Sequence, residues 1–283
     1  FMWPKAFWES LYEPLIRAAA GLGKLDKKSD PSVYDKGFLH CDVLVIGSGP
    51  AGLISAYTAA KRGAKVILAE EDFIFGGRLN SDHNEIDGMP SFEWVTRVIQ
   101  ELESYENVRL LKRTSVYGVF DHGIFGALER KRDYLSSNDM KPRQILWKIY
   151  AKKSILCSGA TERSIMFGNN DRPGIMLSSA VRSYVNRWGV SPGKKITLFV
   201  NNSDGWRTAK DLTEAGCNLA AIIDARSEIP KHSLDVPVYT NSQIVNTKGN
   251  LRLKSVMLQN GSVIKTDCLA VSGGWNPNVH LTC

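Results

Sequence analysis

Residues 41–52 of this chain, Cys-Asp-Val-Leu-Val-Ile-Gly-Ser-Gly-Pro-Ala-Gly, decide its fold. A short apolar run at 43–46 predicts a buried strand, and three glycines with the spacing G-x-G-x-x-G follow it directly. A helix-forming segment at 53–61 comes next. A lone glycine pattern is weak evidence, but strand, glycines and helix in this order indicate a turn that binds nucleotide phosphates. The free N–H groups at the start of the helix would bind them.

The glycines of this turn have separate tasks. Gly47 permits the tight turn, Gly49 lets the backbone approach a pyrophosphate, and Gly52 lets the helix pack against the strand. We therefore expect the turn to surround the pyrophosphate of a dinucleotide through Gly47, Gly49, Pro50, Ala51 and Gly52.

A second apolar run at 65–69 predicts the next strand and ends in Glu70. Glu70 follows Gly47 by a little over twenty residues, where a ribose-binding carboxylate lies in dinucleotide sites. Its charge would repel a 2′-phosphate, so the sequence predicts NAD or FAD rather than NADP. We choose NAD, with Glu71 and the Val116 backbone beside it, and keep FAD as the alternative because one fingerprint serves both.

Paired glycines follow the acid in Gly76-Gly77-Arg78, at a distance that is typical of the glutathione-reductase-like superfamily. We place Gly77 and Arg78 in the cofactor site. For Arg78 the sequence leaves two alternatives open: it faces the cofactor phosphates, or it is a solvated surface arginine.

Two later apolar strands end in small residues. The strand at 155–157 runs into Ser158 and Gly159, and the strand at 268–271 leads to Gly274. In flavoproteins with two dinucleotide domains, such strand ends bring a backbone turn close to the cofactor, so these three residues complete the predicted site.

The strand–helix–strand pattern is repeated later in the chain. Its parts are a strand at 195–200, a helix at 204–215 and a strand at 219–223. The interval from Asn201 to Asp224 equals that from Gly47 to Glu70. The architecture of a Rossmann-like unit is therefore present twice.

The glycines are not repeated. Asn201, Ser203 and Trp206 stand where three glycines belong, with Asp204 between them. A tryptophan fills the space that a pyrophosphate needs, and Asp204 would repel it. We predict that the second unit holds no nucleotide and that the chain binds one dinucleotide.

These patterns predict an α/β fold with two Rossmann-like, glutathione-reductase-like units and antiparallel β insertions. We expect a lead-in and linker at 1–40, a discontinuous first unit at 41–165 plus 266–283, and a second unit at 166–265. A strand at 268–272 is expected to rejoin the sheet that contains 43–46. The aromatic lead-in is expected to dock on this domain or on a partner.

Composition excludes several classes of protein. The 283 residues include 36 Lys+Arg and 29 Asp+Glu, a net charge of +7 that falls in short runs on strand-like segments, so we expect no nucleic-acid partner. No apolar stretch approaches the roughly twenty residues of a membrane span, so we expect no membrane role. The chain starts at Phe1 and stops just after a strand, which led us to expect a fragment.

The five cysteines are scattered without a CxxC pair. This argues against a disulfide reductase of this fold and favours a reducing cytoplasm. The histidines lack metal-ligand spacing, and no acid–base pair or nucleophile with its base is recognisable. We therefore assign no catalytic residue and no metal ligand.

Five segments resemble the family of alpha subunits of heterotetrameric sarcosine oxidases, and the lead-in from Met2 to Gly23 is similar to the same family. They are Arg143–Trp147, Gly159–Arg163, Asn170–Leu177, Asn201–Asp204 and Gly273–Pro277. Large subunits of opine oxidases and related amine dehydrogenases share parts of this pattern. Thr161 and Ser164 depart from the usual His and Pro, and Cys157 from a frequent Ala.

The resemblance implies oxidative demethylation of sarcosine to glycine. O2 would accept the electrons, and tetrahydrofolate would accept the one-carbon group. It places NAD in the alpha subunit, and FAD and FMN in the beta subunit or at its border with alpha. The implied partners are the beta, gamma and delta subunits. It also implies a C-terminal folate-binding domain and an N-terminal ferredoxin-like domain outside these residues.

Two other functions stay open at this point. One is a stand-alone flavoprotein that binds FAD and uses NADH as a hydride donor. The other is a binding scaffold without turnover, needed only for assembly.

Overall fold

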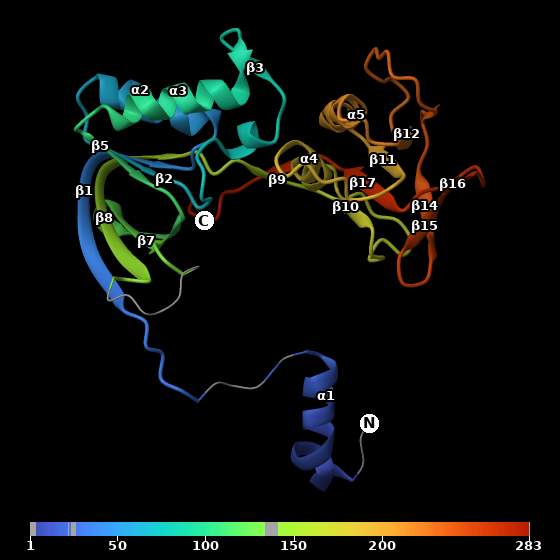
Figure 1. Cartoon of the computed structure of the whole chain (residues 1–283), viewed down its shortest axis with the longest axis horizontal. Coiled ribbons are helices and arrows are strands. Elements are labelled where there is room, and N and C mark those ends of the chain that lie inside the picture. Colours follow the sequence, from blue (N-terminus) through green and yellow to red (C-terminus); the bar gives the residue numbers. More distant parts are fainter. Residues whose placement is uncertain (1–3, 22, 24–26, 134–140, 283) are drawn as a thin grey trace.

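A computed structural model describes residues 4–21, 23, 27–133 and 141–282. Met2, Trp3 and Cys283 lie outside these ranges. Figure 1 shows two α/β bodies side by side, joined by two extended segments, with the N-terminal helix apart from both. Within the described residues, no helix is both long and apolar enough to cross a membrane.

The first body is built on a six-stranded sheet. In spatial order its strands are β5 (Val108–Leu111), β2 (Val66–Ala69), β1 (Tyr34–Ile46), β8 (Gln144–Leu156), β7 (Ile124–Arg130) and β6 (Thr114–Phe120). The strands from β5 to β8 are parallel, whereas β7 and β6 are the predicted antiparallel insertion. Helices α2 (Pro50–Lys61) and α3 (Ser91–Glu103) pack on one face, and a second apolar core lies on the other.

Strands β1 and β8 are longer than the sequence indicated. They pair in parallel from Tyr34 beside Gln144 to Ile46 beside Leu156, 13 residues in each strand. The lead-in and linker predicted for 1–40 are therefore wrong for residues 34–40, which belong to β1. Most of these residues are exposed and polar, so their hydrophobicity did not reveal the strand; pairing with β8 supplies the backbone hydrogen bonds instead.

The second body contains a parallel five-stranded sheet and a small antiparallel sheet. The parallel order is β10 (Ile175–Leu177), β17 (Cys268–Ser272), β11 (Ile196–Val200), β12 (Leu219–Asp224) and β13 (Val238–Tyr239). The antiparallel strands are β14 (Ile244–Gly249), β15 (Leu253–Leu258) and β16 (Val263–Lys265). Helices α4 (Ser178–Asn186) and α5 (Asp204–Glu214) cover one face of the parallel sheet.

The expected return of residues 268–272 to the first sheet was wrong. Strand β17 lies between β10 and β11, and all of its residues are buried there. An apolar strand buried on both faces needs a hydrogen-bonded neighbour on each side, and the second sheet supplies both. The chain returns to the first body only afterwards, where β18 (Trp275–Pro277) pairs with β9 (Ala160–Glu162) and Leu281 packs on the first core.

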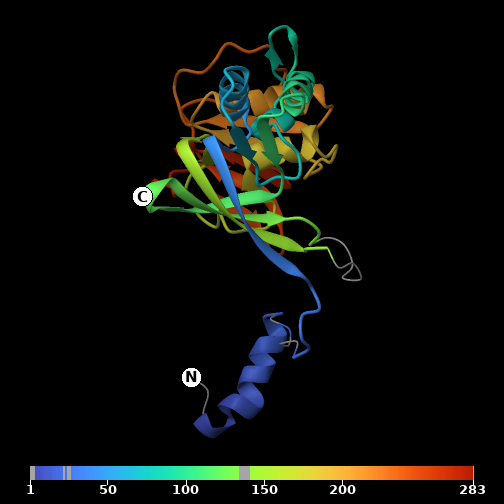
Figure 2. The same cartoon turned by 90° about the vertical axis from the view of Figure 1, so that its left-hand side faces the viewer.

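The described part of the lead-in does not dock on either body. It forms two short helical turns, Lys5–Phe7 and Trp8–Tyr12, and helix α1 (Glu13–Ala19), in which no residue is buried. Figure 2 shows this segment standing away from both sheets. The lead-in was expected to dock on this domain or on a partner, and the described residues show no docking on this domain.

The core of the second body contains a buried carboxylate, Asp224, at the end of β12. The Trp206 indole Nε1–H donates to Asp224 Oδ2 at 2.7 Å, and Arg226 Nη2 donates to the same oxygen at 2.8 Å. Arg226 also donates to Oδ1 through its backbone N at 2.9 Å and its Nε at 3.1 Å. Burial acts to raise the pKa of Asp224, but the hydrogen bonds from Arg226 and Trp206 outweigh it, so the pKa is lowered.

This network links stability to pH. A carboxyl whose folded pKa is lowered stabilises the protein above its unfolded pKa of about 3.9, and this stabilisation is lost as pH falls through the folded value. We expect Arg226→Met to lower the free energy of unfolding at pH 7 by about 2 kcal/mol. The difference from the unmutated protein should shrink below about pH 4.

Denaturant unfolding of both proteins at pH 7 and pH 3 measures this difference, with Arg62→Met at the exposed end of α2 as the control. An Arg226→Met effect that is equal at both pH values would show that Asp224 is not the linked group.

Candidate functional site

A cleft of about 800 Å³ opens at the carboxyl end of β1. Its walls come from the turns after β1, β2 and β8, from the start of β6 and from the C-terminal tail. Eleven of the predicted site residues line it: Gly47, Gly49, Pro50, Ala51, Glu70, Glu71, Gly77, Arg78, Val116, Ser158 and Gly159. Segments far apart in the sequence therefore meet at one place, where parallel sheets commonly bind their ligands.

Backbone contacts shape the glycine turn. Gly47 has φ +97°, and a Cβ there would lie 2.3 Å from the Cys157 carbonyl oxygen. A Cβ on Gly52 would lie 1.9 Å from the Gly47 carbonyl oxygen. The Cα of Gly52 therefore faces the turn itself, so Gly52 can contribute to the predicted site only through its N–H at the start of α2.

Gly49 is different because it faces open space. It lines the cleft, and a Cβ there would have no neighbouring protein atom within 4 Å. Helix α2 begins directly after it without a capping side chain. The first N–H groups of a helix have no partner within the helix, so those at Ala51 and Gly52 are free for an anion.

Glu70 lies at the end of β2 and is only 7% exposed. Its Oε2 accepts hydrogen bonds from Ser48 N at 2.9 Å and Ser48 Oγ at 2.5 Å. Its Oε1 accepts one from Asp72 N at 2.9 Å. These donors fix the carboxylate at the cleft, and its oxygens have further acceptor capacity for a hydroxyl.

Arg78 lines the cleft and has a side chain that is 43% exposed, so both predicted alternatives stay open, and the structure adds a third contact. Its Nη2 donates to both carboxylate oxygens of Asp204, at 3.1 and 3.2 Å. The guanidinium also stacks 4.1 Å from the ring centre of Trp275. Arg78 therefore bridges the first body to the second, and nothing in the sequence near Arg78 indicated Asp204 as its partner.

Gly274 does not reach the cleft. It has φ +102° and accepts a hydrogen bond from Arg163 N at 2.8 Å in the crossover between the bodies. Its predicted role depended on β17 joining the first sheet, so it is corrected for the same reason.

The C-terminal tail supplies cleft residues that the sequence did not reveal, among them Asn278, His280 and Leu281. Asn278 fastens the tail to the turn after β8. Its backbone N donates to Gly159 O at 3.0 Å, and its Nδ2 donates to Ser158 O at 3.0 Å. In return it accepts hydrogen bonds from Ser158 Oγ at 2.6 Å and Thr161 Oγ1 at 2.8 Å. The tail has no periodic pattern, so only this long-range pairing identifies it.

The second unit fills the equivalent positions with its own side chains. Asn202 Oδ1 accepts hydrogen bonds from Asp204 N at 3.0 Å and Gly205 N at 3.3 Å, the first N–H groups of α5. Trp206 is buried and donates its indole N–H to the Asp224 carboxylate at the end of β12, as described above. The positions predicted for phosphate and ribose in the first unit thus correspond to internal hydrogen bonds in the second.

The described cysteines are free thiols, and three of them have a raised pKa. Burial raises the pKa of Cys41 to about 11 and that of Cys268 to about 12. Burial also raises the pKa of Cys157, which lines the cleft. Because the thiolate is the reactive form, these groups favour packing roles.

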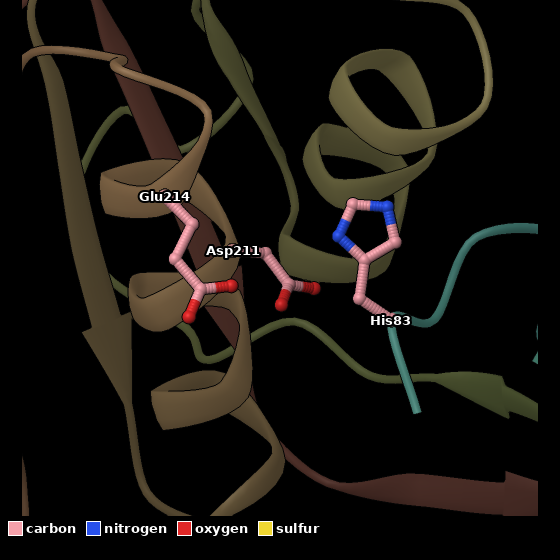
Figure 3. Close-up of side chains that lie close together, drawn as sticks. All are labelled: His83, Asp211 and Glu214. Atoms are coloured by element: carbon pink, nitrogen blue, oxygen red, sulfur yellow. The ribbon is translucent and has the colours of Figure 1, made fainter. Parts of the chain in front are cut away.

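His83, Asp211 and Glu214 bring possible metal-ligand atoms within 4.8 Å of one another (Figure 3). Asp211 is already engaged, however: its Oδ2 lies 3.0 Å from Arg182 Nε and accepts a hydrogen bond from Asn186 at 2.9 Å. A neighbouring guanidinium opposes a cation at the same carboxylate, so we assign no metal to this group.

Comparison with known proteins supports a dinucleotide-binding fold of this kind. Residues 42–124 match the family of FAD dependent oxidoreductases. The whole chain aligns at 41% identity with the sarcosine oxidase subunit alpha of Rhizobium meliloti (strain 1021). The same subunit of Corynebacterium sp. (strain U-96) is 39% identical over 93% of this chain.

The chain spans 29% of the length of each of these relatives. Among solved structures, L-proline dehydrogenase from P. horikoshii matches 91% of this chain and 46% of its own, with a TM-score of 0.67 and 24% identity. This likeness supports the fold alone. The predicted class, α/β with FAD/NAD(P)-binding Rossmann-like units, is confirmed. Along its whole length, the chain is similar to a part of the sarcosine oxidase alpha subunits.

Proposed function

We propose that this chain is the dinucleotide-binding part of the alpha subunit of a heterotetrameric sarcosine oxidase, and that its dinucleotide is NAD. The complex would oxidise sarcosine to glycine, with O2 and tetrahydrofolate as acceptors and with flavin chemistry on the beta subunit. The observation that carries the proposal is the cleft itself, in which an open glycine turn faces a fixed carboxylate.

The residues of the cleft fit a dinucleotide. The pyrophosphate would lie over Gly49, where space is free, and accept hydrogen bonds from the first N–H groups of α2. Glu70 would accept a hydrogen bond from a ribose hydroxyl. Glu71 and Val116 also line the cleft and would contact the adenosine, whereas Gly77, Ser158 and Gly159 would contact the rest of the dinucleotide.

We propose that the flavins and the amine pocket lie on the partner subunits. We see no acid–base pair or activated nucleophile along the described cleft, and burial raises the pKa of Cys157, the thiol that lines it. The chain's own residues would bind and orient the dinucleotide and contribute to assembly with the beta, gamma and delta subunits. The scattered cysteines favour a cytoplasmic location.

FAD is the second candidate for the same cleft. The matching family model describes FAD dependent oxidoreductases, and the glycine turn and Glu70 would serve FAD equally well. A chain that carries FAD would act as an NADH-dependent flavoprotein or as the large subunit of a related opine or amine dehydrogenase.

A side chain at Gly49 tests the pyrophosphate position. We expect Gly49→Val to abolish NAD binding while the protein stays folded, since Gly49 has φ −62° and open space around it. Calorimetric titration with NAD measures the affinity, and Ser203→Ala at the equivalent position of the second unit is the matched control. Strong weakening by Ser203→Ala, or two sites per unmutated chain, would move the site to the second unit.

The identity of the cofactor is tested separately. We expect NADP to bind at least about tenfold more weakly than NAD, because like charges in contact cost several kcal/mol. Glu70→Gln should narrow this difference. A visible absorption spectrum of the purified protein gives the independent check: releasable FAD in the cleft would contradict the choice of NAD.

Reconstitution tests the function of the assembly. We expect no sarcosine-dependent peroxide formation by this chain alone, and formation once the full alpha subunit is combined with the beta, gamma and delta subunits. The assay would compare sarcosine with other secondary amines. NADH turnover by the isolated chain would favour the stand-alone flavoprotein instead.

A further inference from the structure

One wall of the cleft is a segment without a sheet of its own. This segment, residues 72–84, connects β2 to the short strand β3 (Glu85–Ile86) and includes only the helical turn Gly77–Asn80. We call it the cleft wall. The residues that it places in the cleft are Gly77, Arg78, Leu79, Asp82 and Asn84.

Arg182 of α4, in the second body, holds the cleft wall at Asp82. Its side chain is 2% exposed, and its Nη1 donates to Asp82 Oδ1 at 2.9 Å. Its Nη2 donates to the Asp204 carbonyl oxygen at 3.2 Å. The guanidinium also lies 3.0 Å from Asp211 Oδ2, so three carboxylate-bearing residues surround one arginine.

Helix α4 and Arg187, the residue that follows it, contact the cleft wall at further points. Ser183 Oγ donates to Ser81 Oγ at 3.0 Å, and Asn186 Nδ2 donates to the Ser81 carbonyl oxygen at 2.8 Å. Arg187 pairs with both oxygens of Asp72, at 2.7 and 3.1 Å. Figure 3 shows His83, on the same segment, facing α5.

Burial makes the Arg182 contact sensitive to geometry. A buried charge is tolerated only where well-placed partners replace its hydration, and the planar guanidinium fork offers its donors in fixed directions. The position of Asp82 is therefore fixed relative to α4. Arg182 is not among the residues that line the cleft, so any effect on a ligand passes through Asp82 and the rest of the cleft wall.

We propose that Arg182 is a positioning residue for dinucleotide binding, through which the second unit holds the cleft wall in its binding geometry. This inference rests on the proposed function, since it takes a dinucleotide as the occupant of the cleft. The second unit would then support the binding site of the first unit without binding a nucleotide itself.

The experiment compares Arg182→Met with Arg226→Met and with the unmutated protein. Arg226→Met is the matched control, because it also removes an arginine from a buried aspartate of the second unit but lies at the end of β12. Two quantities are measured on folded protein: NAD affinity by calorimetry, and amide hydrogen exchange without NAD. The informative amides are those of Gly76, Leu79, Ser81 and Asp82, which are hydrogen bonded in the cleft wall or to Ser48.

For Arg182→Met we expect NAD affinity to fall about tenfold, within the range for coupling through a packed network. Exchange should accelerate at the four amides and stay unchanged in α2. Arg226→Met should change neither quantity. Unchanged affinity in Arg182→Met, or equal weakening in Arg226→Met, would overturn the proposal.

Two further results have a defined meaning. If the unmutated protein binds no NAD, the proposed function fails, and unchanged exchange in Arg182→Met would overturn the positioning role as well. If Arg182→Met does not fold, the same two quantities are measured on Arg182→Lys. Lysine keeps the positive charge but lacks the planar guanidinium group with its fixed donors. Weaker NAD binding with faster exchange in that variant supports the proposal, and values equal to the unmutated protein overturn it.

Discussion

The close approach of backbones at the turn between β1 and α2 is the constraint on which the rest of the structure depends. Gly47, Gly52 and the Cys157 carbonyl meet there with no room for a side chain between them. This contact holds the start of α2 against the ends of β1 and β8. It therefore fixes both the floor of the cleft and the place where the chain leaves β8 toward the second body. A displacement at this turn would move the phosphate-binding N–H groups and the crossover together.

Much of this arrangement could be predicted from the sequence because its signals are local. The glycine spacing, the acid at the end of β2 and the repeated interval to Asp224 each lie within one strand–helix–strand unit, where sequence distance fixes spatial distance. The substitution of glycines by Asn201, Ser203 and Trp206 led to the prediction that the second unit holds no nucleotide, and the structure shows the hydrogen bonds made by the side chains there. Trp206 bonds to Asp224, and the neighbouring Asn202 occupies the start of α5.

The parts that the sequence did not reveal depend on long-range pairing. Strand β17 is equally apolar whichever sheet it joins, and only the available neighbours, β10 and β11, decide the choice. The first half of β1 is too polar to be recognised without β8. In the same way, the sequence around Arg78 predicts contact with a cofactor or with solvent. It gives no sign of the hydrogen bond to Asp204, which lies far away in the chain. The tail that carries Asn278 also gives no signal before its turn around Ser158 is formed.

The two units use one architecture but satisfy their buried polar groups differently. In the second unit Asn202 accepts from the first N–H groups of α5, and Asp224 is saturated by Trp206 and Arg226. In the first unit no side chain caps α2, and Glu70 keeps acceptor capacity toward the cleft. Because polar groups at such positions favour partners, the first unit can accept a ligand there, whereas the second satisfies the equivalent groups by itself. A unit that needs no ligand keeps the same shape whether or not the cleft is occupied. This is the property required of a body that supports the cleft wall, which the second unit contacts through α4.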